Sequence, residues 1–506
     1  MRYISKLILI FLLAAALYGG PGRLIPPAKS GVNLRPDGLN QTYNSPAGLF
    51  VLHYTNTGND SVPQVYSTDT GVPDYILYAA TYLERGYRLL KDTLNLPLPP
   101  VDDIRNPEID IYFRHLGYGV YGQTTAELSK ALPGRPKAYT AFSEIHHTLT
   151  GPGFFTEGLD ALKVTCVHEL FHVFQVGIGI WNLNEDMWFY ETSATWIEEL
   201  AYPDVNDYFQ YVDRYVNNWG KSIHDYIYDN VTWLIFLNNI YKGEASSAIW
   251  NAIAEQSVWP SITDFLMEKN SSQGWAGHLA AWGMEHLYAD YLPELSHFED
   301  GEAYSPLLFP AGSFRAYSVI DSFTIVTYGE PFSSSFYKIQ HITTPSIQLR
   351  ILSPGNVSGK AWSSGSHTRS VDLSREFTTI SGAGEPWDLL IALGTDEAYT
   401  IGEPLRITLD IREGESSLLS LYPNPVTDSR FVTIRYHLKD DSEKGILDMY
   451  DILGREINSL KLYPEETRAG LHTVTRNIPE TLASGVYIMV LRFDNHTFPA
   501  KVTLLK

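Results

Sequence analysis

The stretch VTCVHELFHVFQ runs from Val164 to Gln175 and is apolar except for a few positions. It contains His168, Glu169 and His172. On an α-helix, at about 100° per residue, these three side chains and Gln175 share one narrow stripe. The rest of the circumference is apolar, so this helix should be packed on most of its sides. An ordinary solvated face would carry Lys, Arg and Glu, whereas histidine is a weak helix former and a weak solubiliser. The burial of these polar groups therefore needs a compensating partner.

The spacing of the two histidines predicts a metal site. Histidines at positions i and i+4 direct their nitrogens toward one point, which suits a tetrahedral Zn²⁺ ion with bonds of about 2.0–2.1 Å. Glu169 follows His168 directly and lies on the side where an attacking water would sit, as a candidate general base. The alternative is a buried pair of hydrogen-bonded core histidines with a structural glutamate. A catalytic zinc ion needs a third protein ligand, so the following residues decide between the two.

The third ligand is expected on the next helix. A histidine six residues after His172 would be typical of metzincins, but Ile178 stands there and excludes that subclass. The segment NEDMWFYETSATWIEEL (184–200) reads as a second helix, with Asp186 as its expected N-cap. Glu191 lies 191 − 172 = 19 residues after His172 and is the predicted third ligand.

A second carboxylate shares the stripe of Glu191. Glu198 lies two turns further on and is expected to accept the free N–H of a ligating histidine, which fixes its tautomer. Glu185 remains an alternative third ligand outside the helical frame. An amphipathic helix with a solvated acidic side is the other alternative, and it fits Glu199 well.

These residues resemble the gluzincin metallopeptidases, in which H-E-x-x-H and a glutamate on the following helix bind zinc. The resemblance implies an α+β zincin-like domain, with His168, His172 and Glu191 as ligands and Glu169 as general base. Thr195 departs from the thermolysin branch, which has an aspartate at this position. The region 49–256 is also similar to a group of secreted bacterial zinc proteases, through FVLHYTNTG as a strand, GVPDYI as a helix entry and YGQT as a turn.

Peptide hydrolysis also requires a donor for the oxyanion besides zinc. Tyr190 stands beside the third ligand, and the segment SIHDYIYDNVTW offers His224, Tyr226 and Tyr228. We prefer Tyr228 because it precedes a strongly apolar helix that would hold it rigidly. The chain has 33 tyrosines, so a structural role remains the alternative for each of them.

The composition limits the classes of partner. Lys and Arg number 37 and Asp and Glu 58, which gives a net charge of −21 and argues against nucleic acids and anionic membranes. One cysteine, Cys166, excludes an intrachain disulfide and reads as a small core residue. His146 and His147 are expected to be strand or surface residues, because no acid lies at ligand spacing.

The first residues predict export. Residues 1–19 carry Arg2 and Lys6 before an apolar core and read as a cleaved signal peptide of the Sec pathway. No later stretch approaches 18 uninterrupted apolar residues, so no transmembrane segment is expected after signal removal. Residues 20–45 are rich in Pro and Gly and read as a leader or pro-segment.

The remaining patterns predict a multidomain protein. Residues 46–302 form the predicted α+β catalytic domain, with helical patterns from about residue 159. Residues 303–413 show short alternating runs typical of a β-sandwich. Residues 414–506 predict a small Ig-like β-sandwich of six or seven strands. In its segment FVTIRYHL (431–438) the even positions, Val432, Ile434, Tyr436 and Leu438, are expected to face the core.

The last block also contains a set of short motifs that bear on where the protein is sent. The segments LYPNP (421–425), MYDILGREI (449–457) and SGVYIMVL (484–491) precede a terminal KVTLLK. Together they resemble the sorting domain read by the type IX secretion system. The resemblance implies that residues 421–506 bind that machinery and that the protein is secreted or held at the outer-membrane surface. A generic Ig-like binding domain is the alternative.

The expected function is hydrolysis of peptide bonds in a protein or peptide substrate, with one catalytic zinc ion and Glu169 as base. The alternative is a surface adhesin or binding protein with a structural or inactive zinc domain. Zinc-dependent hydrolysis of a non-peptide bond is a third possibility. Retention of Glu169 favours an enzyme, since this residue would add nothing to a purely structural site.

Overall fold

The computed structural model describes most of the chain, which divides into two compact units, Met1–Leu308 and Phe309–Lys506. The predicted signal peptide lies outside the described residues, as does part of the predicted leader. The described residues are 23–27, 34–102, 107–271, 274–305, 313–315, 323–342, 346–352, 357–364, 370–382, 387–396, 405–413, 417–427, 431–479 and 481–505.

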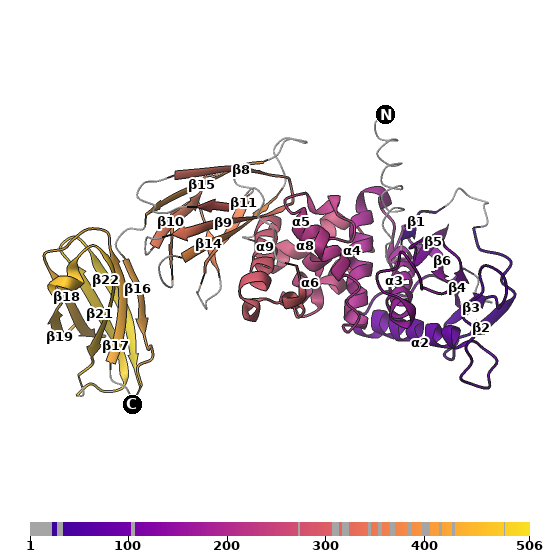
Figure 1. Ribbon diagram of the computed structural model, residues 1–506, viewed down its shortest axis with the longest axis horizontal. Helices are drawn as coiled ribbons and strands as arrows, with labels where there is room; N and C mark the ends of the chain where they lie inside the picture. Colours follow the sequence, from indigo (N-terminus) through magenta and orange to yellow (C-terminus); the bar gives the residue numbers. More distant parts are fainter. Residues whose placement is uncertain are drawn as a thin grey trace. The chain divides into compact units, whose positions relative to one another are not determined.

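Unit 1 begins with a mixed six-stranded sheet in the order β1-β5-β6-β4-β3-β2 (Figure 1). The pairs β1/β5, β3/β4 and β4/β6 are parallel, whereas β5/β6 and β2/β3 are antiparallel. The strands are β1 (Leu24–Ile25), β2 (Gln41–Asn44), β3 (Phe50–Tyr54), β4 (Ile109–Arg114), β5 (Gly122–Ser129) and β6 (Tyr139–His146).

The alternation of apolar residues accounts for β3, in which Phe50, Leu52 and Tyr54 are buried and the residues between them are partly exposed. The YGQT segment is different from the prediction. It is not a turn, because Gly122, Gln123 and Thr124 form the start of β5. Strand β5 lacks a clear apolar alternation and is held by its neighbours in the sheet, so local pattern reading missed it.

Two helices link this sheet to the rest of unit 1. Helix α2 (Asp74–Arg88) continues into a π-helical turn, Leu89–Thr93, and contacts β3. Helix α3 (Gly158–Ile178) packs on β5, β6 and α2. From Val164 to Ile178 every residue of α3 is buried, as its apolar circumference predicts.

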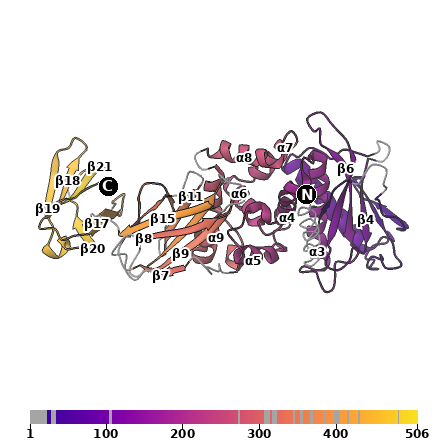
Figure 2. The same ribbon diagram turned by 90° about the horizontal axis from the view of Figure 1, so that it is seen from above.

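The second half of unit 1 is helical (Figure 2), as the sequence predicts for this region. Helix α4 contacts α3 and also α6 and α8, so it lies between the two halves of unit 1. The helices are α4 (Leu183–Ala201), α5 (Phe209–Asn217), α6 (Val231–Ile240), α7 (Glu244–Ile253), α8 (Val258–Lys269) and α9 (Gly274–Tyr291).

Unit 2 consists mainly of β-strands in its described residues, with one short helical turn at Pro464–Thr467. A four-stranded sheet (β13-β10-β15-β8) and a five-stranded sheet (β12-β11-β14-β9-β7) contribute to one apolar cluster, which includes Ile339, Leu349 and Ile391. These strands are β7 (Ser313–Arg315), β8 (Phe323–Gly329), β9 (Ser334–Ile342), β10 (Ser346–Ile351), β11 (Val357–Ser363), β12 (Val371–Leu373), β13 (Thr378–Ser381), β14 (Trp387–Thr395) and β15 (Leu405–Glu413).

The last part of unit 2 has a core of its own. The sheets β16-β17-β20 and β19-β18-β21-β22 share a second apolar cluster. In β17 the predicted core positions Val432, Ile434, Tyr436 and Leu438 are at most 1% exposed, which confirms their orientation. The strands are β16 (Ser417–Tyr422), β17 (Phe431–Leu438), β18 (Gly445–Asp451), β19 (Glu456–Lys461), β20 (Gly470–Asn477), β21 (Gly485–Phe493) and β22 (Thr497–Leu504).

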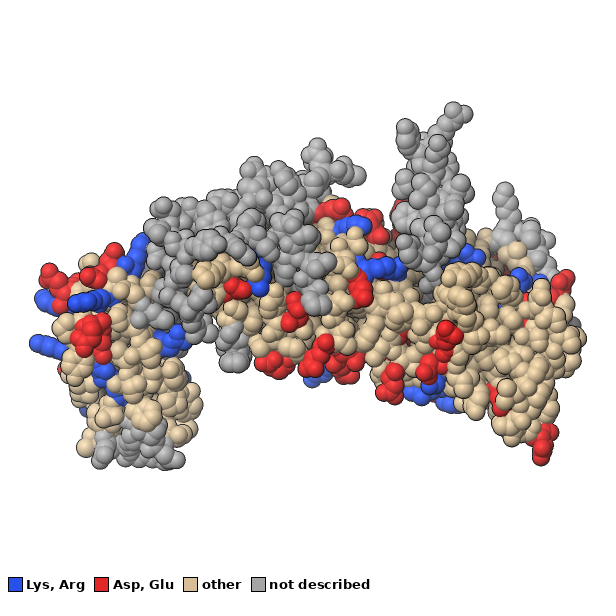
Figure 3. All heavy atoms as spheres, viewed as in Figure 1, with Lys and Arg blue, Asp and Glu red and all other residues tan. Residues whose placement is uncertain are grey.

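The charge distribution on the surface and the character of the helices both bear on possible partners. On the face drawn in Figure 3, acidic and basic side chains of the described residues are interspersed and form no broad basic patch. Among the helices of the described residues, none combines the length and the apolar character needed to span a bilayer.

Candidate metal centre

Helices α3 and α4 bring three predicted ligands together. His168 and His172 lie one turn apart on α3 and are fully buried, and Glu191 on α4 is 1% exposed. The Oε2 atom of Glu191 lies 3.4 Å from Nε2 of His168 and 3.3 Å from Nε2 of His172. The three ligand atoms all lie within 4.8 Å of one another. Residues 19 positions apart along the chain thus face a common point.

The residues fit a tetrahedral metal ion. Two ligands of a zinc ion with bonds of about 2.0–2.1 Å lie about 3.3–3.4 Å apart, which matches the two distances to Glu191. Nε2 of His168, Nε2 of His172 and Oε2 of Glu191 are buried and have no hydrogen-bond partner in the described part of the chain. Three unsatisfied polar atoms at one buried point are costly unless a cation binds them.

The opposite edge of each imidazole is held by a hydrogen bond. Nδ1 of His168 lies 2.6 Å from Oε1 of Glu198, as the sequence predicts. Nδ1 of His172 lies 2.6 Å from Oε1 of Gln175, whose Nε2 donates to the carbonyl oxygen of Tyr190 and to Oγ of Ser193. Both acceptors place the proton on Nδ1 and leave Nε2 free for a metal. The sequence put Gln175 on the polar stripe but gave it no role.

Glu169 is held beside this cluster by β5. Its Oε2 accepts a 2.6 Å hydrogen bond from Oγ1 of Thr124, while its Oε1 has no partner in the described residues. A Cβ atom on Gly122 would lie 2.5 Å from Oε1, so only glycine leaves room for the carboxylate. Burial raises the pKa of Glu169 to about 8, and a cation held by the neighbouring ligand atoms would lower it again and favour the ionised carboxylate. The position of this glutamate depends on β5, which the sequence did not identify as a strand.

The centre is rich in buried carboxylates. Glu169, Glu191 and Glu198 are all at most 2% exposed. Burial alone would raise the pKa of Glu191, but the facing imidazoles lower it to about 2. Burial raises the pKa of Glu198 to about 7. Three buried acids around two imidazoles favour a bound cation. Without it, only the imidazoles could compensate the negative charge of these carboxylates.

The candidate oxyanion donors separate into two groups. Tyr228 is the candidate that interacts with the carboxylates of the centre: burial, and then the charges of Glu191 and Glu169, raise its pKa well above the usual value. The hydroxyl groups of Tyr190 and Tyr226 donate to the backbone carbonyl oxygens of Gly179 and Asn218. The structure therefore directs these two hydroxyls away from the ligand cluster.

The remaining predicted residues lie outside the cluster. His224 is exposed, and its Nδ1 lies 2.9 Å from Oγ of Ser222. Glu185 is exposed, so it does not share the buried site. Asp186 is not the N-cap, because α4 begins at Leu183 after Asn182 and Asp186 accepts the Asn182 backbone N–H from the first turn.

Residue Thr195 has a local role. Its Oγ1 donates to the backbone carbonyl oxygen of Glu191, one turn earlier on α4. This bond is the usual way for a buried threonine to satisfy its hydroxyl inside a helix. Glu198, and not Thr195, accepts the hydrogen bond from Nδ1 of His168.

One contact comes from the predicted leader. The backbone N–H of Leu24 in β1 donates a 2.9 Å hydrogen bond to Oε1 of Glu191. Leu24 is 3% exposed and pairs with Thr124 of β5. No sequence pattern indicates this contact, because residues 20–45 show no periodicity.

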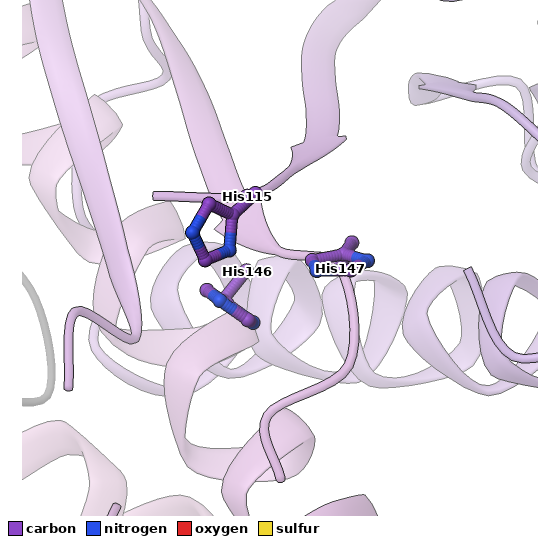
Figure 4. Close-up of side chains that lie close together, drawn as sticks. All are labelled: His115, His146 and His147. Carbon is purple, nitrogen blue, oxygen red and sulfur yellow. The ribbon is translucent and has the colours of Figure 1, made fainter. Parts of the chain in front are cut away.

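A second histidine cluster lies at the ends of β4 and β6 (Figure 4). The nearest ring nitrogens of His115, His146 and His147 lie within 4.8 Å of one another. Nδ1 of His146 faces the backbone N–H groups of Thr148 and Leu149 at 3.3 Å, so it acts as an acceptor and the proton of the neutral ring is on Nε2. His146 therefore has neither nitrogen free for a metal, which distinguishes this cluster from the one on α3 and α4.

Several solved structures match parts of the chain. A GH2 β-galacturonidase from Eisenbergiella tayi is 10% identical with a TM-score of 0.17, and the match covers 34% of each chain. CopC from Methylosinus trichosporium OB3b is 18% identical with a TM-score of 0.14, over 18% of this chain and 91% of CopC. A mutant of PliG from Escherichia coli, a periplasmic inhibitor of g-type lysozyme, is 14% identical with a TM-score of 0.16, over 20% of this chain and 98% of the inhibitor. The chain thus spans about a third of the length of the galacturonidase, and these scores carry no argument on fold or function.

The family comparison concerns the end of the chain. No curated protein matches the sequence. Residues 420–504 match the secretion system C-terminal sorting domain, which confirms the predicted sorting domain within unit 2. This match indicates export through type IX secretion to the cell surface or the exterior, and it implies that the domain interacts with that machinery.

Proposed function

We propose that unit 1 is a zinc-dependent peptidase of the gluzincin type, exported to act on protein or peptide substrates outside the cell. One observation carries the proposal. Three buried atoms without hydrogen-bond partners, from His168, His172 and Glu191, are separated by distances that fit a tetrahedral zinc ion. The acid next to His168 and the two outer acceptors complete the set that such a hydrolase requires.

When bound, zinc supplies a Lewis acid that lowers the pKa of a water molecule toward about 7 and polarises the scissile carbonyl group. Glu169 accepts the proton of the attacking water on Oε1, while Thr124 holds its Oε2 in place. The same carboxyl group then donates this proton to the leaving amine. Glu198 and Gln175 keep the two imidazoles in one orientation and tautomer throughout.

Tyr228 is the proposed donor to the oxyanion. Its raised pKa keeps the phenol protonated at neutral pH, so that it can donate a hydrogen bond. The interaction of Tyr228 with the carboxylates of Glu191 and Glu169 supports its position beside the reacting groups. Tyr190 and His224 are poorer candidates, because the first is bonded to a backbone carbonyl and the second is exposed.

The proposal is tested by metal analysis and hydrolysis of unfolded casein. We expect one zinc ion per chain in the wild type and in Glu169→Gln, and loss of zinc in Glu191→Ala. Glu169→Gln should lower casein hydrolysis by about 10²–10⁴-fold, because it removes the general base. Glu185→Gln is the matched control and should keep both zinc and activity, because Glu185 is exposed.

Two outcomes would contradict the peptidase. Hydrolysis that is unchanged by a chelator and by Glu169→Gln would refute the zinc mechanism. A protein that binds one zinc ion and hydrolyses no protein or peptide would favour the surface adhesin.

A further inference from the structure

The sheet edge beside the metal centre carries a short strand from the predicted leader. Without β1, the edge of the sheet would be β5, which is antiparallel to β6 on its other side. Leu24 and Ile25 pair in parallel with Thr124 and Thr125, and Thr124 N–H donates to the Arg23 carbonyl at 3.0 Å. In Figure 1, β1 lies at this edge of unit 1. Strand β5 thus offers its free main-chain groups to an extended segment of peptide.

The bound strand also reaches the ligand cluster. The Leu24 N–H donates to Oε1 of Glu191, whose other oxygen faces the two ligand imidazoles. Thr124, the partner of Leu24 in the sheet, holds Glu169 through its side chain. Strand β1 also contacts α4. Residues 23–25 therefore lie between the strand that positions the base and the helix that carries the third ligand.

The strand is poorly suited to permanent pairing. It has two residues, and Pro26 and Pro27 follow directly, which cannot donate N–H groups to a sheet. Its hold on the domain comes from the buried Leu24 side chain, a few main-chain bonds, and the surface bond from Arg23 to Gln123. These are the contacts of a bound peptide rather than of a core strand.

The leader is fixed much more firmly further along. Arg35 donates to both carboxylate oxygens of Glu127 at 2.8 Å and also to Asp110 and Asp102. Strand β2 then pairs with β3 over four residues. Removal of the residues before Ala28 would leave these anchors in place.

We propose that the edge of β5 beside the metal centre is a binding site for extended polypeptide with an apolar side chain at the Leu24 position, and that residues 23–27 fill it in the intact chain. The leader is then an internal blocker of the proposed peptidase, and its departure opens the edge to substrate. The blocking role rests on the proposed function, whereas the peptide-binding role does not.

The experiment uses a fluorescent synthetic peptide, PGRLIPPAKS, which corresponds to residues 21–30. We compare the protein that begins at Gly20 with one that begins at Ala28, both with zinc. The peptide should bind to the shorter protein at least ten-fold more tightly, because the longer one has its edge filled. An analogue with N-methyl-Leu at the Leu24 position should bind at least ten-fold more weakly, since it lacks the N–H that Glu191 accepts. A scrambled peptide is the control.

A second variant of the protein controls for misfolding of the shorter protein. A specific protease site inserted after Ser30 lets the leader be cut from protein that has already folded with it. Cleavage should raise casein hydrolysis ten-fold or more, and added PGRLIPPAKS peptide should reverse the gain. Equal binding of the peptide to the long and short proteins, or no effect of N-methylation, would overturn the proposal.

The two proposals fail in different ways. If the peptide binds as expected and no form of the protein hydrolyses casein, the binding site stands and the peptidase fails. If the long and short proteins hydrolyse casein at equal rates and neither is inhibited by the peptide, the peptidase stands and the blocking role fails.

Discussion

Nδ1 of His168 and Oε1 of Glu198 lie 2.6 Å apart, although the two residues are 30 positions apart on different helices. The bond fixes the proton on Nδ1, so that Nε2 faces Glu191. Glu198→Leu should weaken zinc affinity about 10–100-fold, because the imidazole of His168 loses its hydrogen-bond acceptor. Glu198→Gln keeps an acceptor oxygen and should recover most of the affinity. Competition with a chromogenic chelator measures both, and equal affinities for the two variants would contradict this role.

Gln175 should have a double role, because it binds His172 and also links α3 to α4. Gln175→Leu should weaken zinc affinity about 10–100-fold. It should also lower the free energy of unfolding of the zinc-free protein by about 1–3 kcal/mol, since the Tyr190 carbonyl and the Ser193 hydroxyl both lose the buried amide donor of Gln175. Gln175→Glu keeps the acceptor for the imidazole but not the donor, so it should retain zinc and lose stability. Zinc titration and urea denaturation separate the two effects.

Gly122 should be essential for the base but not for the metal. The Cβ atom of an alanine would lie 2.5 Å from Oε1 of Glu169, which forces the carboxylate to move. Gly122→Ala should therefore lower casein hydrolysis by about 10²-fold or more while zinc binding remains. Gly179→Ala is the matched control, because its Cβ would meet no atom closer than 3.5 Å. Full activity of Gly122→Ala would show that Glu169 does not act from this position.

Tyr228 and Tyr190 should respond differently to loss of the hydroxyl group. Tyr228→Phe should lower kcat by about 10²–10³-fold with unchanged zinc affinity, because it removes a donor to the oxyanion. Tyr190→Phe loses only the bond to the Gly179 carbonyl and should leave kcat within a few-fold of the wild type. Similar kcat values for the two variants would exclude Tyr228 as the donor.

Stability should fall in acid because of His286. Burial lowers the pKa of His286 to about 3, against about 6.5 in an unfolded chain. Between these values the unfolded chain binds one more proton, so the stabilisation is complete above pH 6.5 and is lost as pH falls toward 3. The slope from this group approaches about 1.4 kcal/mol per pH unit.

The variant His286→Gln should reduce that slope, whereas His224→Gln should not, because His224 is exposed. Urea denaturation in the presence of a chelator removes the contribution of zinc release. Tryptophan fluorescence is a suitable signal, since nine of the 11 tryptophans precede residue 309. An unchanged slope in His286→Gln would refute the assignment.

The leader prediction concerns a part of the chain whose role the sequence left open. Residues 20–45 read as a pro-segment from composition alone, without any contact to the site. The hydrogen bond from Leu24 to Glu191 joins residues 167 positions apart, and no local pattern encodes such a separation. Pairing with β5 depends on a strand that the sequence also did not identify.

The sequence by itself determined the candidate ligands, the two helices that carry them and the sorting domain, because each depends on spacing within a short segment. His168, His172 and Glu198 could be placed on helix faces from a period of about 3.6 residues. The zinc ion and the peptidase activity remain predictions that the geometry of these residues supports.

Only the tertiary structure decided how the proposed general base is held and what covers the candidate metal centre. Thr124 reaches Glu169 from 45 positions away, and Gly122 leaves the space that this carboxylate needs. Gln175, Tyr228 and Leu24 likewise acquire or lose their roles through contacts between separate elements. The physical reason is that helix periodicity is a local property, whereas the pairing of β5 and the packing of α3 against α4 are set by surfaces distant in the sequence.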